Sequence, residues 1–585
     1  MTADSARRRG RDSASGRGQD SASGAALPEA AGDLAGALDL LLADGALGVL
    51  RRFRPDGVTL RLAASLARNP QAVAGEAALL GAELARIAAG RSQLAPDRKD
   101  RRFADPAWGQ NPLLKRAMQA YLATGQAAER VLADADLDWR DGERLRFVLM
   151  NVIAAASPSN NPLLSPAGIK ALVDTGGLAA VRGIRALARD LAAAPRVPSM
   201  VEPGAFEVGK DLAVTPGSVV YRTEMFELIK YAPTTEQVNK YPLLIVPPMI
   251  NKFYITDLAP GRSMTEFLVG QGHQVFTISW RNPDYRHKDW DLDSYGGSVV
   301  DALNVVRAIT GAAKASICAL CSGGIVSSMV AAHLSAFAQL DTLASLCLGV
   351  TVLDQTRAGT AGAMIDEGTA TAAMAASRAR GYLDGRTLAE VFAWLRPDDL
   401  IWNYWVNNYL QGRTPPAFDI LYWNADTTRL PAALHHDFIE LALDNALVRP
   451  DATTMLGSPV DLSKVDSDGY VVAGVADHLC PWQSCYRSTQ LLGGQVTFVL
   501  STSGHIASMV NPPDNPKATF QVAGDNPADP AEWLADATTV SGSWWPHYSS
   551  WLAARSGGTK KSKAKAGSKE YAVLCPAPGT YVHDR

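Results

Sequence analysis

The first part of the chain, up to about residue 200, carries hydrophobic positions at helical spacing. From about residue 30 it is rich in Ala, Leu and Arg, and apolar side chains recur every three or four residues, as in residues 117–122 and 142–150. That period places the apolar side chains on one face of a helix. Because strand signals are few here, the pattern predicts an N-terminal helical domain over residues 28–205.

Short apolar runs typical of strands begin at residues 217–222 and alternate with helical segments from there on. The later runs are residues 243–246, 315–320, 343–350, 469–476 and 495–501. Alternating strands and helices indicate a largely parallel sheet with helices on both faces. We therefore expect an α/β fold with a catalytic domain over residues 206–556.

The two ends of the chain differ in composition from the rest. Residues 1–27 are rich in Arg and contain Asp-Ser-Ala-Ser-Gly at residues 12–16 and again at 20–24. Such low-complexity polar segments bury little apolar surface, so we predict a disordered tail. Toward the other end, a lysine run predicts a basic linker over residues 557–570, followed by an end segment over residues 571–585.

Composition and charge restrict the compartment and the partners. Six cysteines occur in 585 residues without the spacing of a disulfide framework, which favours a reducing compartment. The N-terminus lacks the apolar core of a signal peptide, and no uncharged apolar stretch reaches the length of about 18 residues that spans a bilayer. We therefore expect a cytoplasmic protein without a membrane span. The formal net charge of −3 gives no reason to expect nucleic acid as a partner.

Cys321 stands at a predicted turn between a strand and a helix. The apolar run 315–320 precedes it, Gly323 lies two residues later, and residues 325–334 have a helical composition. A sharp turn of this kind at a nucleophile is the nucleophile elbow of α/β-hydrolases, here with sulfur in place of a hydroxyl. The helix N-terminus behind it favours a thiolate. Ala319 replaces the first glycine of the motif, and a cysteine in an apolar run is otherwise a small buried residue.

The rest of a catalytic triad follows in the chain order of this fold, which is nucleophile, acid, histidine. A predicted strand ends at Asp477, and His505 lies in the loop after the next strand. We therefore predict Cys321, Asp477 and His505 as the catalytic residues. His478 is either a hydrogen-bond partner behind the acid or a residue that ends the strand.

The other cysteines carry weaker signals. Cys318 and Cys347 lie inside predicted strands and are expected to pack in the core, and Cys575 carries no signal. Cys480 and Cys485 are five residues apart with no second ligand pair nearby, which is a poor pattern for zinc. We expect core or loop thiols, and we predict neither a metal ion nor a cofactor.

The long segment between Asp354 and Gly469 does not show the alternation of strands and helices seen in the rest of the predicted catalytic domain. It is dense in aromatic side chains: Phe392, Trp394, Trp402, Tyr404, Trp405, Tyr409, Phe418, Tyr422 and Trp423. An α/β-hydrolase sheet usually carries its cap at this position. We therefore expect a cap insertion over about residues 355–460, whose movement would gate entry of substrate.

Several segments resemble the polyhydroxyalkanoate synthases, the polymerases of 3-hydroxyacyl-CoA. The acid and histidine blocks are residues 477–482, Asp-His-Leu-Cys-Pro-Trp, and residues 504–513, Gly-His-Ile-Ala-Ser-Met-Val-Asn-Pro-Pro. Further blocks that resemble this family are residues 100–108, 247–254, 279–283, 423–431 and 577–582. The resemblance runs from about residue 95 to the end of the chain. It implies a single-component synthase of class I or class II.

The resemblance implies an acyltransferase that carries the growing polyester on Cys321 and releases CoA. Exchange of one thioester for another keeps the acyl group activated. His505 would deprotonate Cys321, and Asp477 either orients His505 or helps to activate the 3-hydroxyl of the incoming substrate. The oxyanion would be held by the backbone N–H of Ser322 and by one from an earlier loop, for which Ile250 is the candidate.

The resemblance also implies partners and a location. These are (R)-3-hydroxyacyl-CoA, the growing polyester chain and granule surface, a second copy in a homodimer, and the cytoplasm at polyester granules. Two alternatives stay open, namely a cysteine-dependent α/β-hydrolase of the dienelactone type and a non-catalytic granule-associated paralogue. The elbow and residues 250–254 look more like medium-chain synthases, whereas the length is nearer the short-chain class. We expect activity beyond the four-carbon substrate.

Overall fold

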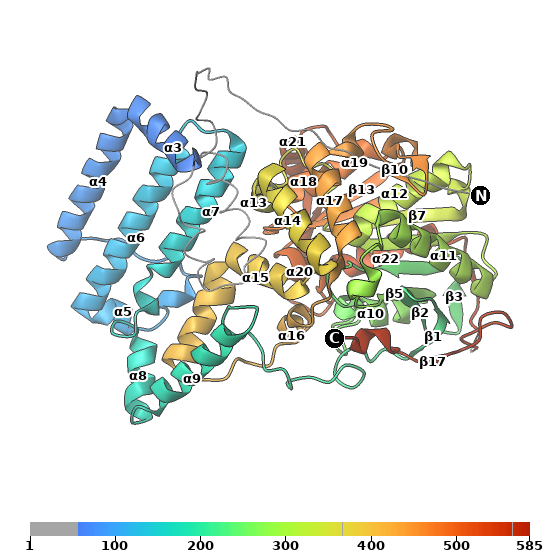
Figure 1. The fold of residues 1–585 in the computed structure, drawn as a ribbon, viewed down its shortest axis with the longest axis horizontal. Helices are drawn as coiled ribbons and strands as arrows, with labels where there is room; N and C mark the ends of the chain where they lie inside the picture. Colours follow the sequence, from blue (N-terminus) through green and yellow to red (C-terminus); the bar gives the residue numbers. More distant parts are fainter. Residues whose placement is uncertain (1–56, 365–366, 564) are drawn as a thin grey trace, which may run out of the picture.

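The computed structural model describes residues 57–585, except residues 365, 366 and 564. The predicted disordered tail, residues 1–27, and the start of the predicted helical domain lie outside the described residues. The first described part of the chain is a group of helices on one side of the molecule (Figure 1). They are α3 Gly57–Arg68, α4 Pro70–Ala88, α5 Ala107–Gln110, α6 Pro112–Ala133, α7 Trp139–Ala155, α8 Pro166–Asp174 and α9 Leu178–Ala192, with short 3-10 turns at Arg101–Phe103 and Pro158–Asn160.

Local sequence sets where these helices begin. The Asn111 side chain accepts a hydrogen bond from the N–H of Leu113 at the start of α6, and the Ser165 hydroxyl accepts one from the N–H of Gly168 at the start of α8. In both helices a proline takes the first helical position, where its missing N–H costs nothing. The helices pack on one another through α4, α6 and α7, and no strand of the main sheet comes from this part of the chain.

An 11-stranded sheet forms the centre of the second part of the chain, with the order β15-β14-β13-β12-β7-β6-β4-β5-β2-β1-β17. Its strands are β1 Gly217–Arg222, β2 Phe226–Tyr231, β4 Leu243–Val246, β5 Val275–Trp280, β6 Ala315–Leu320, β7 Leu343–Gly349, β12 Gly469–Gly474, β13 Val496–Ser501, β14 Thr519–Val522, β15 Thr538–Ser541 and β17 Cys575–Pro576. The strands from β5 to β13 in this order run parallel, and the strands outside them pair antiparallel.

Both faces of the sheet are covered. In β4, Leu244 and Val246 belong to one buried hydrophobic cluster, and Leu243 and Ile245 belong to another. Successive side chains of a strand point to opposite faces, so a strand that is apolar throughout needs cover on both. The helices of this part of the chain are α10 Met264–Gly270, α11 Leu292–Thr310, α12 Ser322–Ala336, α18 Trp482–Tyr486, α19 Ser488–Leu491, α20 His505–Met509, α21 Pro530–Asp536 and α22 Trp544–Ala554. The predicted α/β-hydrolase class, with an N-terminal helical region, is confirmed.

The first part of the segment between β7 and β12 lies between the sheet and the N-terminal helices, whereas its last strands, β10 Thr454–Met455 and β11 Ser458–Pro459, lie against α11 and α12 (Figure 1). The segment also contains α13 Gly359–Ala363, α14 Glu367–Arg380, β8 Tyr382–Leu383, α15 Gly385–Leu395, π-helical turns at Asp398–Trp402 and Trp405–Leu410, α16 Asp419–Ala425, β9 Leu430–Pro431 and α17 Ala432–Asp444. The Tyr409 hydroxyl donates a 2.8 Å hydrogen bond to Asp190 of α9, and the Trp423 indole donates one of 2.7 Å to the Lys252 carbonyl. Side chains of this segment therefore join the N-terminal helices to the loop after β4.

The C-terminal residues are part of the sheet domain. Strand β17 pairs with β1, and β16 Thr559–Lys561 pairs with β3 Gln237–Asn239. Glu227 of β2 is fully buried, and its carboxylate accepts hydrogen bonds from the N–H groups of Thr580 and Tyr581 at 2.8 and 3.0 Å. The same carboxylate pairs with Arg222. The last residues of the chain thus supply hydrogen-bond donors to a buried carboxylate, and Arg222 of β1 neutralises its charge.

Deletion of residues 575–585 is expected to lower the free energy of unfolding by about 3 kcal/mol, because the Glu227 carboxylate keeps Arg222 but loses the N–H donors of Thr580 and Tyr581, each worth about 1.5 kcal/mol or more toward a charged group. Urea denaturation measures this change. The matched control is Lys517→Ala at an exposed position, for which we expect a change within about 0.5 kcal/mol. A loss below about 1 kcal/mol in the deletion variant would show that the end segment is dispensable for the sheet domain.

Candidate active site

Cys321 occupies the turn between β6 and α12 in a strained backbone conformation. Its φ is 51° and its ψ is −121°, a region that residues with a side chain rarely adopt. The Cys321 N–H donates a 2.9 Å hydrogen bond to the Gly349 carbonyl at the end of β7, which ties the turn to the neighbouring strand. The side chain is partly buried. This is the geometry of a nucleophile elbow.

The two glycines after Cys321 let the helix approach the sheet. A Cβ on Gly323 would lie 2.5 Å from the Val246 carbonyl and 2.7 Å from the Pro247 carbonyl, so no side chain fits. A Cβ on Gly324 would collide with the side chain of Thr351. Ala319, where the usual motif has glycine, is fully buried in β6 between β4 and β7. Close packing at this position therefore tolerates a methyl group.

Asp477 and His505 lie at the same edge of the sheet as Cys321. Asp477 follows β12, and His505 follows β13 and opens α20. The His505 Nδ1 and the Asp477 Oδ2 are 2.7 Å apart, and both residues are 8 % exposed. The other carboxylate oxygen, Oδ1, accepts hydrogen bonds of 2.9 Å from the N–H groups of Leu479 and Cys480. Both oxygens of Asp477 are thus engaged within the protein, one of them by the histidine.

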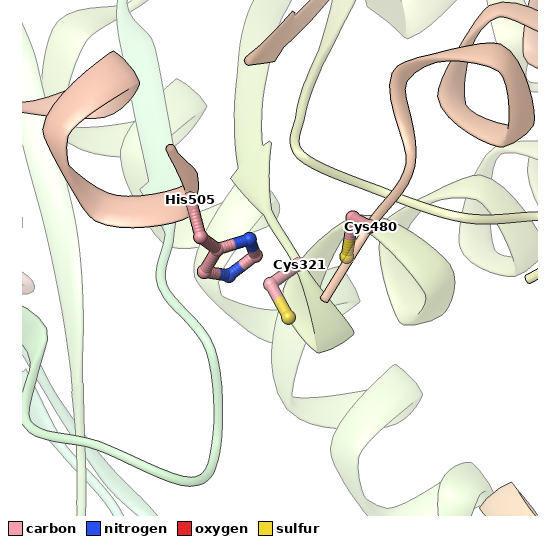
Figure 2. Close-up of side chains that lie close together, drawn as sticks. All are labelled: Cys321, Cys480 and His505. Atoms are coloured by element: carbon pink, nitrogen blue, oxygen red, sulfur yellow. The ribbon is translucent and has the colours of Figure 1, made fainter. Parts of the chain in front are cut away.

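Cys480 is a close neighbour of Cys321, which sequence reasoning did not predict. The sulfur atoms of Cys321 and Cys480 and a ring nitrogen of His505 all lie within 4.8 Å of one another (Figure 2). The thiol of Cys485, five residues after Cys480 in the sequence, donates a hydrogen bond to the Cys480 carbonyl at 3.6 Å. The sequence did offer one signal for this contact: Cys480 stands only three residues after Asp477. Its N–H donates a hydrogen bond to the Asp477 carboxylate, which holds the turn in place.

Charge and hydrogen bonding favour a thiolate–imidazolium pair. A hydrogen bond from the Cys480 thiol lowers the pKa of Cys321 well below its usual value; burial opposes this, and the hydrogen bond and charge of His505 reinforce it. Burial disfavours the charged His505 ring, but the charge and hydrogen bond of Asp477 and the contact with Cys321 raise the pKa of His505 to about 10. The hydrogen bond to Cys321, together with burial, raises the pKa of Cys480. These shifts favour the ionised form of the Cys321 thiol and the neutral form of the Cys480 thiol.

One of the two predicted oxyanion donors, the N–H of Ser322, lies beside Cys321. The N–H of Ser322 is directed at Cys321 and helps to lower the pKa of its thiol. The Ser322 hydroxyl accepts a 3.1 Å hydrogen bond from the N–H of Met249, so that amide is already engaged. Ile250 follows directly in the same loop, and its carbonyl accepts a hydrogen bond from the N–H of Thr428. Ile250 therefore stays our proposed second donor.

His478 is held as a neutral ring beside the acid. Burial and the charge of Arg396 lower the pKa of His478 to about 4. Among the described residues, its buried Nδ1 has no hydrogen-bond partner. Arg396 comes from the segment between β7 and β12, and its guanidinium lies against the histidine loop, where a Cβ on Gly504 would be 3.2 Å away. The segment between β7 and β12 thus reaches the candidate site through Arg396, a residue that the sequence analysis did not single out.

The chain is similar to several known proteins. The family profile "Poly-beta-hydroxybutyrate polymerase (PhaC) N-terminus" matches residues 99–268, and the profile "alpha/beta hydrolase fold" matches residues 250–512. The chain is 46% identical over 518 residues to poly(3-hydroxyalkanoate) polymerase 1 of Ectopseudomonas oleovorans, covering 88% of this chain and 92% of that protein. It is 38% identical over 508 residues to poly(3-hydroxyalkanoate) polymerase subunit PhaC of Cupriavidus necator, covering 85% of each. A monoacylglycerol lipase structure from Paleococcus ferrophilus overlaps 57% of this chain and 100% of its own, with 12% identity and a TM-score of 0.31.

The fold and the turn at Cys321 place the chain in the α/β-hydrolase class, with a cysteine at the position of the nucleophile. The extent and identity of the matches narrow this class further: the chain belongs to the poly(3-hydroxyalkanoate) polymerase family, whose members are acyltransferases.

A thiolate–imidazolium pair at Cys321 and His505 should change how the alkylation rate of Cys321 depends on pH. Because the pKa of Cys321 lies below its usual value, its thiolate should already be present at neutral pH. The rate of alkylation of Cys321 by iodoacetamide should therefore change less than about threefold between pH 6.5 and pH 8, whereas an ordinary thiol with a pKa of about 8.5 gains about tenfold per unit. Mass spectrometry of the Cys321 peptide measures the rate.

Asp477→Asn is the matched variant for this measurement, because it removes the charge that keeps His505 protonated. Its alkylation rate should fall at neutral pH and rise with pH like that of an ordinary thiol. A wild-type rate that already rises tenfold per unit through neutral pH would contradict the ion pair.

Proposed function

We propose that this chain polymerises (R)-3-hydroxyacyl-CoA into a polyhydroxyalkanoate polyester, with release of CoA and with Cys321, His505 and Asp477 as its catalytic residues. The observation that carries the proposal is the elbow cysteine beside a histidine that is bound at 2.7 Å to a buried carboxylate, in a chain of the poly(3-hydroxyalkanoate) polymerase family.

The first step of the proposed mechanism loads the enzyme. The Cys321 thiolate attacks the thioester carbonyl, and the N–H groups of Ser322 and Ile250 hold the oxyanion. As the intermediate collapses, the C–S bond to CoA breaks, and protonated His505 gives its proton to the leaving sulfur. The acyl group is now a thioester on Cys321. Since thioester replaces thioester, little of its reactivity is lost.

The second step extends the polymer. The 3-hydroxyl of a second substrate attacks the thioester on Cys321, and His505, neutral after the first step, takes the hydroxyl proton. An ester bond forms and the Cys321 thiolate leaves, so the chain now ends in a CoA thioester. Attack of Cys321 on that thioester reloads the enzyme and frees CoA. Each added unit thus releases one CoA. Asp477 orients His505 and stabilises its charged form, a role that the engagement of both carboxylate oxygens supports.

The proposed setting is the cytoplasm at the surface of polyester granules, with the enzyme acting as a homodimer on its soluble CoA substrate and its growing polyester. Within residues 57–585 as described, no helix is long and apolar enough to cross a membrane. The segment between β7 and β12 acts as the cap. Its contact with the histidine loop through Arg396 supports a role for cap movement in substrate entry.

Cys321→Ala is expected to abolish release of CoA from (R)-3-hydroxybutyryl-CoA, because the acyl carrier is lost. The matched control is Cys318→Ala, since Cys318 lies fully buried in β6 and only packs in the core. It should keep most of the activity. Comparable losses of CoA release in the two variants would contradict the assignment of Cys321 as the nucleophile. Hydrolysis of the substrate by the wild-type protein to the free acid, without polyester, would indicate a hydrolase instead.

His505→Gln and Asp477→Asn are expected to slow the first turnover of CoA release by at least about a hundredfold each, because both act on the same proton transfer. Rapid-quench measurement of CoA within a single turnover tests this. The double variant should be little worse than either single variant, since the two groups work as a unit. An Asp477→Asn variant with a normal first turnover and slow elongation would assign the carboxylate to the substrate hydroxyl.

A further inference from the structure

Three metal-binding side chains converge at the nucleophile. The Sγ atoms of Cys321 and Cys480 and a ring nitrogen of His505 lie within 4.8 Å of one another, although the proposed reaction uses only Cys321 and His505 (Figure 2). Two sulfurs and one imidazole are a ligand set that Zn²⁺ and similar borderline or soft divalent ions prefer, whereas Mg²⁺ and Ca²⁺ require oxygen ligands. Cys480 therefore gives this site a property that a lone cysteine–histidine pair lacks.

The spacing is close to that of a tetrahedral site. Zinc–sulfur bonds of about 2.3 Å and zinc–nitrogen bonds of about 2.0 Å place the ligand atoms about 3.5–3.8 Å apart. Because the three atoms lie within 4.8 Å of one another, they need to approach by no more than about 1.3 Å to reach these separations, which a change in thiol rotamer supplies. Cys321 is partly buried rather than enclosed, so a fourth position stays available to water. Three protein ligands and one open position are typical of zinc bound at reactive sites.

The surrounding hydrogen bonds orient two of the three ligands. The Nδ1 of His505 is hydrogen-bonded to Asp477 at 2.7 Å, so Nε2 is the ring nitrogen that can bind an ion. A carboxylate behind a metal-binding histidine fixes the ring and raises its affinity for the ion. The second oxygen of the same carboxylate accepts the N–H of Cys480 at 2.9 Å and so holds the turn that carries this thiol. One buried carboxylate thus positions two prospective ligands.

We infer that Cys321, Cys480 and His505 form a binding site for a borderline or soft divalent cation such as Zn²⁺. Both sulfurs bind the ion as thiolates and His505 binds it through Nε2 of a neutral ring, so the proton of the Cys480 thiol and the Nε2 proton of the His505 imidazolium are released to solvent on binding. If the proposed function holds, a bound ion occupies both the acyl carrier and its base, and it inhibits the enzyme reversibly until a chelator removes it.

Metal binding itself provides the test, because it does not depend on polymerisation. Purified full-length protein is stripped with a chelator, kept reduced with a phosphine and titrated with Co²⁺, whose thiolate charge-transfer absorption reports sulfur ligands. Zn²⁺ affinity follows from competition with a chromogenic chelator. We expect a single Co²⁺ per chain with a thiolate band, displaced by Zn²⁺.

Cys480→Ala should weaken Zn²⁺ binding at least about tenfold and reduce the thiolate band. Cys480→Val, which retains side-chain bulk, should do the same and guards against a folding defect, checked by circular dichroism. Cys575→Ser, at a partly buried cysteine of β17, should leave the affinity unchanged. Wild-type affinity in both Cys480 variants, or no thiolate band in the reduced wild-type protein, would overturn the inference. CoA release measured with and without Zn²⁺ then tests inhibition separately.

Discussion

The site depends on the strained turn at Cys321. Its positive φ is held because α12 packs directly on the ends of β4 and β7, an approach that Gly323 and Gly324 permit and any larger residue would block. Since the central strands are parallel, their carboxyl ends meet at one edge, and the loops after β12 and β13 deliver Asp477 and His505 to the same place. The backbone geometry therefore comes first, and the chemistry of the thiol follows from it.

A continuous chain of charge and hydrogen bonds runs through this edge. Asp477 holds the His505 ring and, through the N–H of Cys480, the turn that brings a second thiol beside the nucleophile. Each contact favours the ionised form of Cys321: the imidazolium supplies charge, and the Cys480 thiol and the Ser322 N–H supply hydrogen bonds. A thiolate that is maintained at neutral pH needs no separate deprotonation before attack. A thiolate is also a better metal ligand than a thiol, so the proposed reactivity and the inferred metal binding have the same physical basis.

The sequence predicted the α/β class because its strands are short and apolar throughout, and strands buried on both faces have this pattern. It also indicated Asp477 and His505 as partners of Cys321, and the structure brings these residues to the same edge of the sheet, because the loops after β12 and β13 end there. Cys480 escaped prediction, since its contact with Cys321 depends on the turn after β12 rather than on any period in the sequence. The aromatic cap segment was expected over the acyl site, yet Tyr409 binds Asp190 in the N-terminal helices. Aromatic density indicates burial, but it does not specify which surface a ring covers.

Peptide mapping of the acylated enzyme shows which residue carries the acyl group. The protein is mixed with (R)-3-hydroxyacyl-CoA, quenched in acid within one turnover and digested, and the mass of each cysteine peptide is measured. We expect the mass of a single acyl unit on the peptide that contains Cys321 and none on the peptide that contains Cys480, because the raised pKa of Cys480 favours its thiol form. Release of CoA without any acyl group on Cys321, or an acyl group carried by a different residue, would contradict the assignment of Cys321 as the acyl carrier.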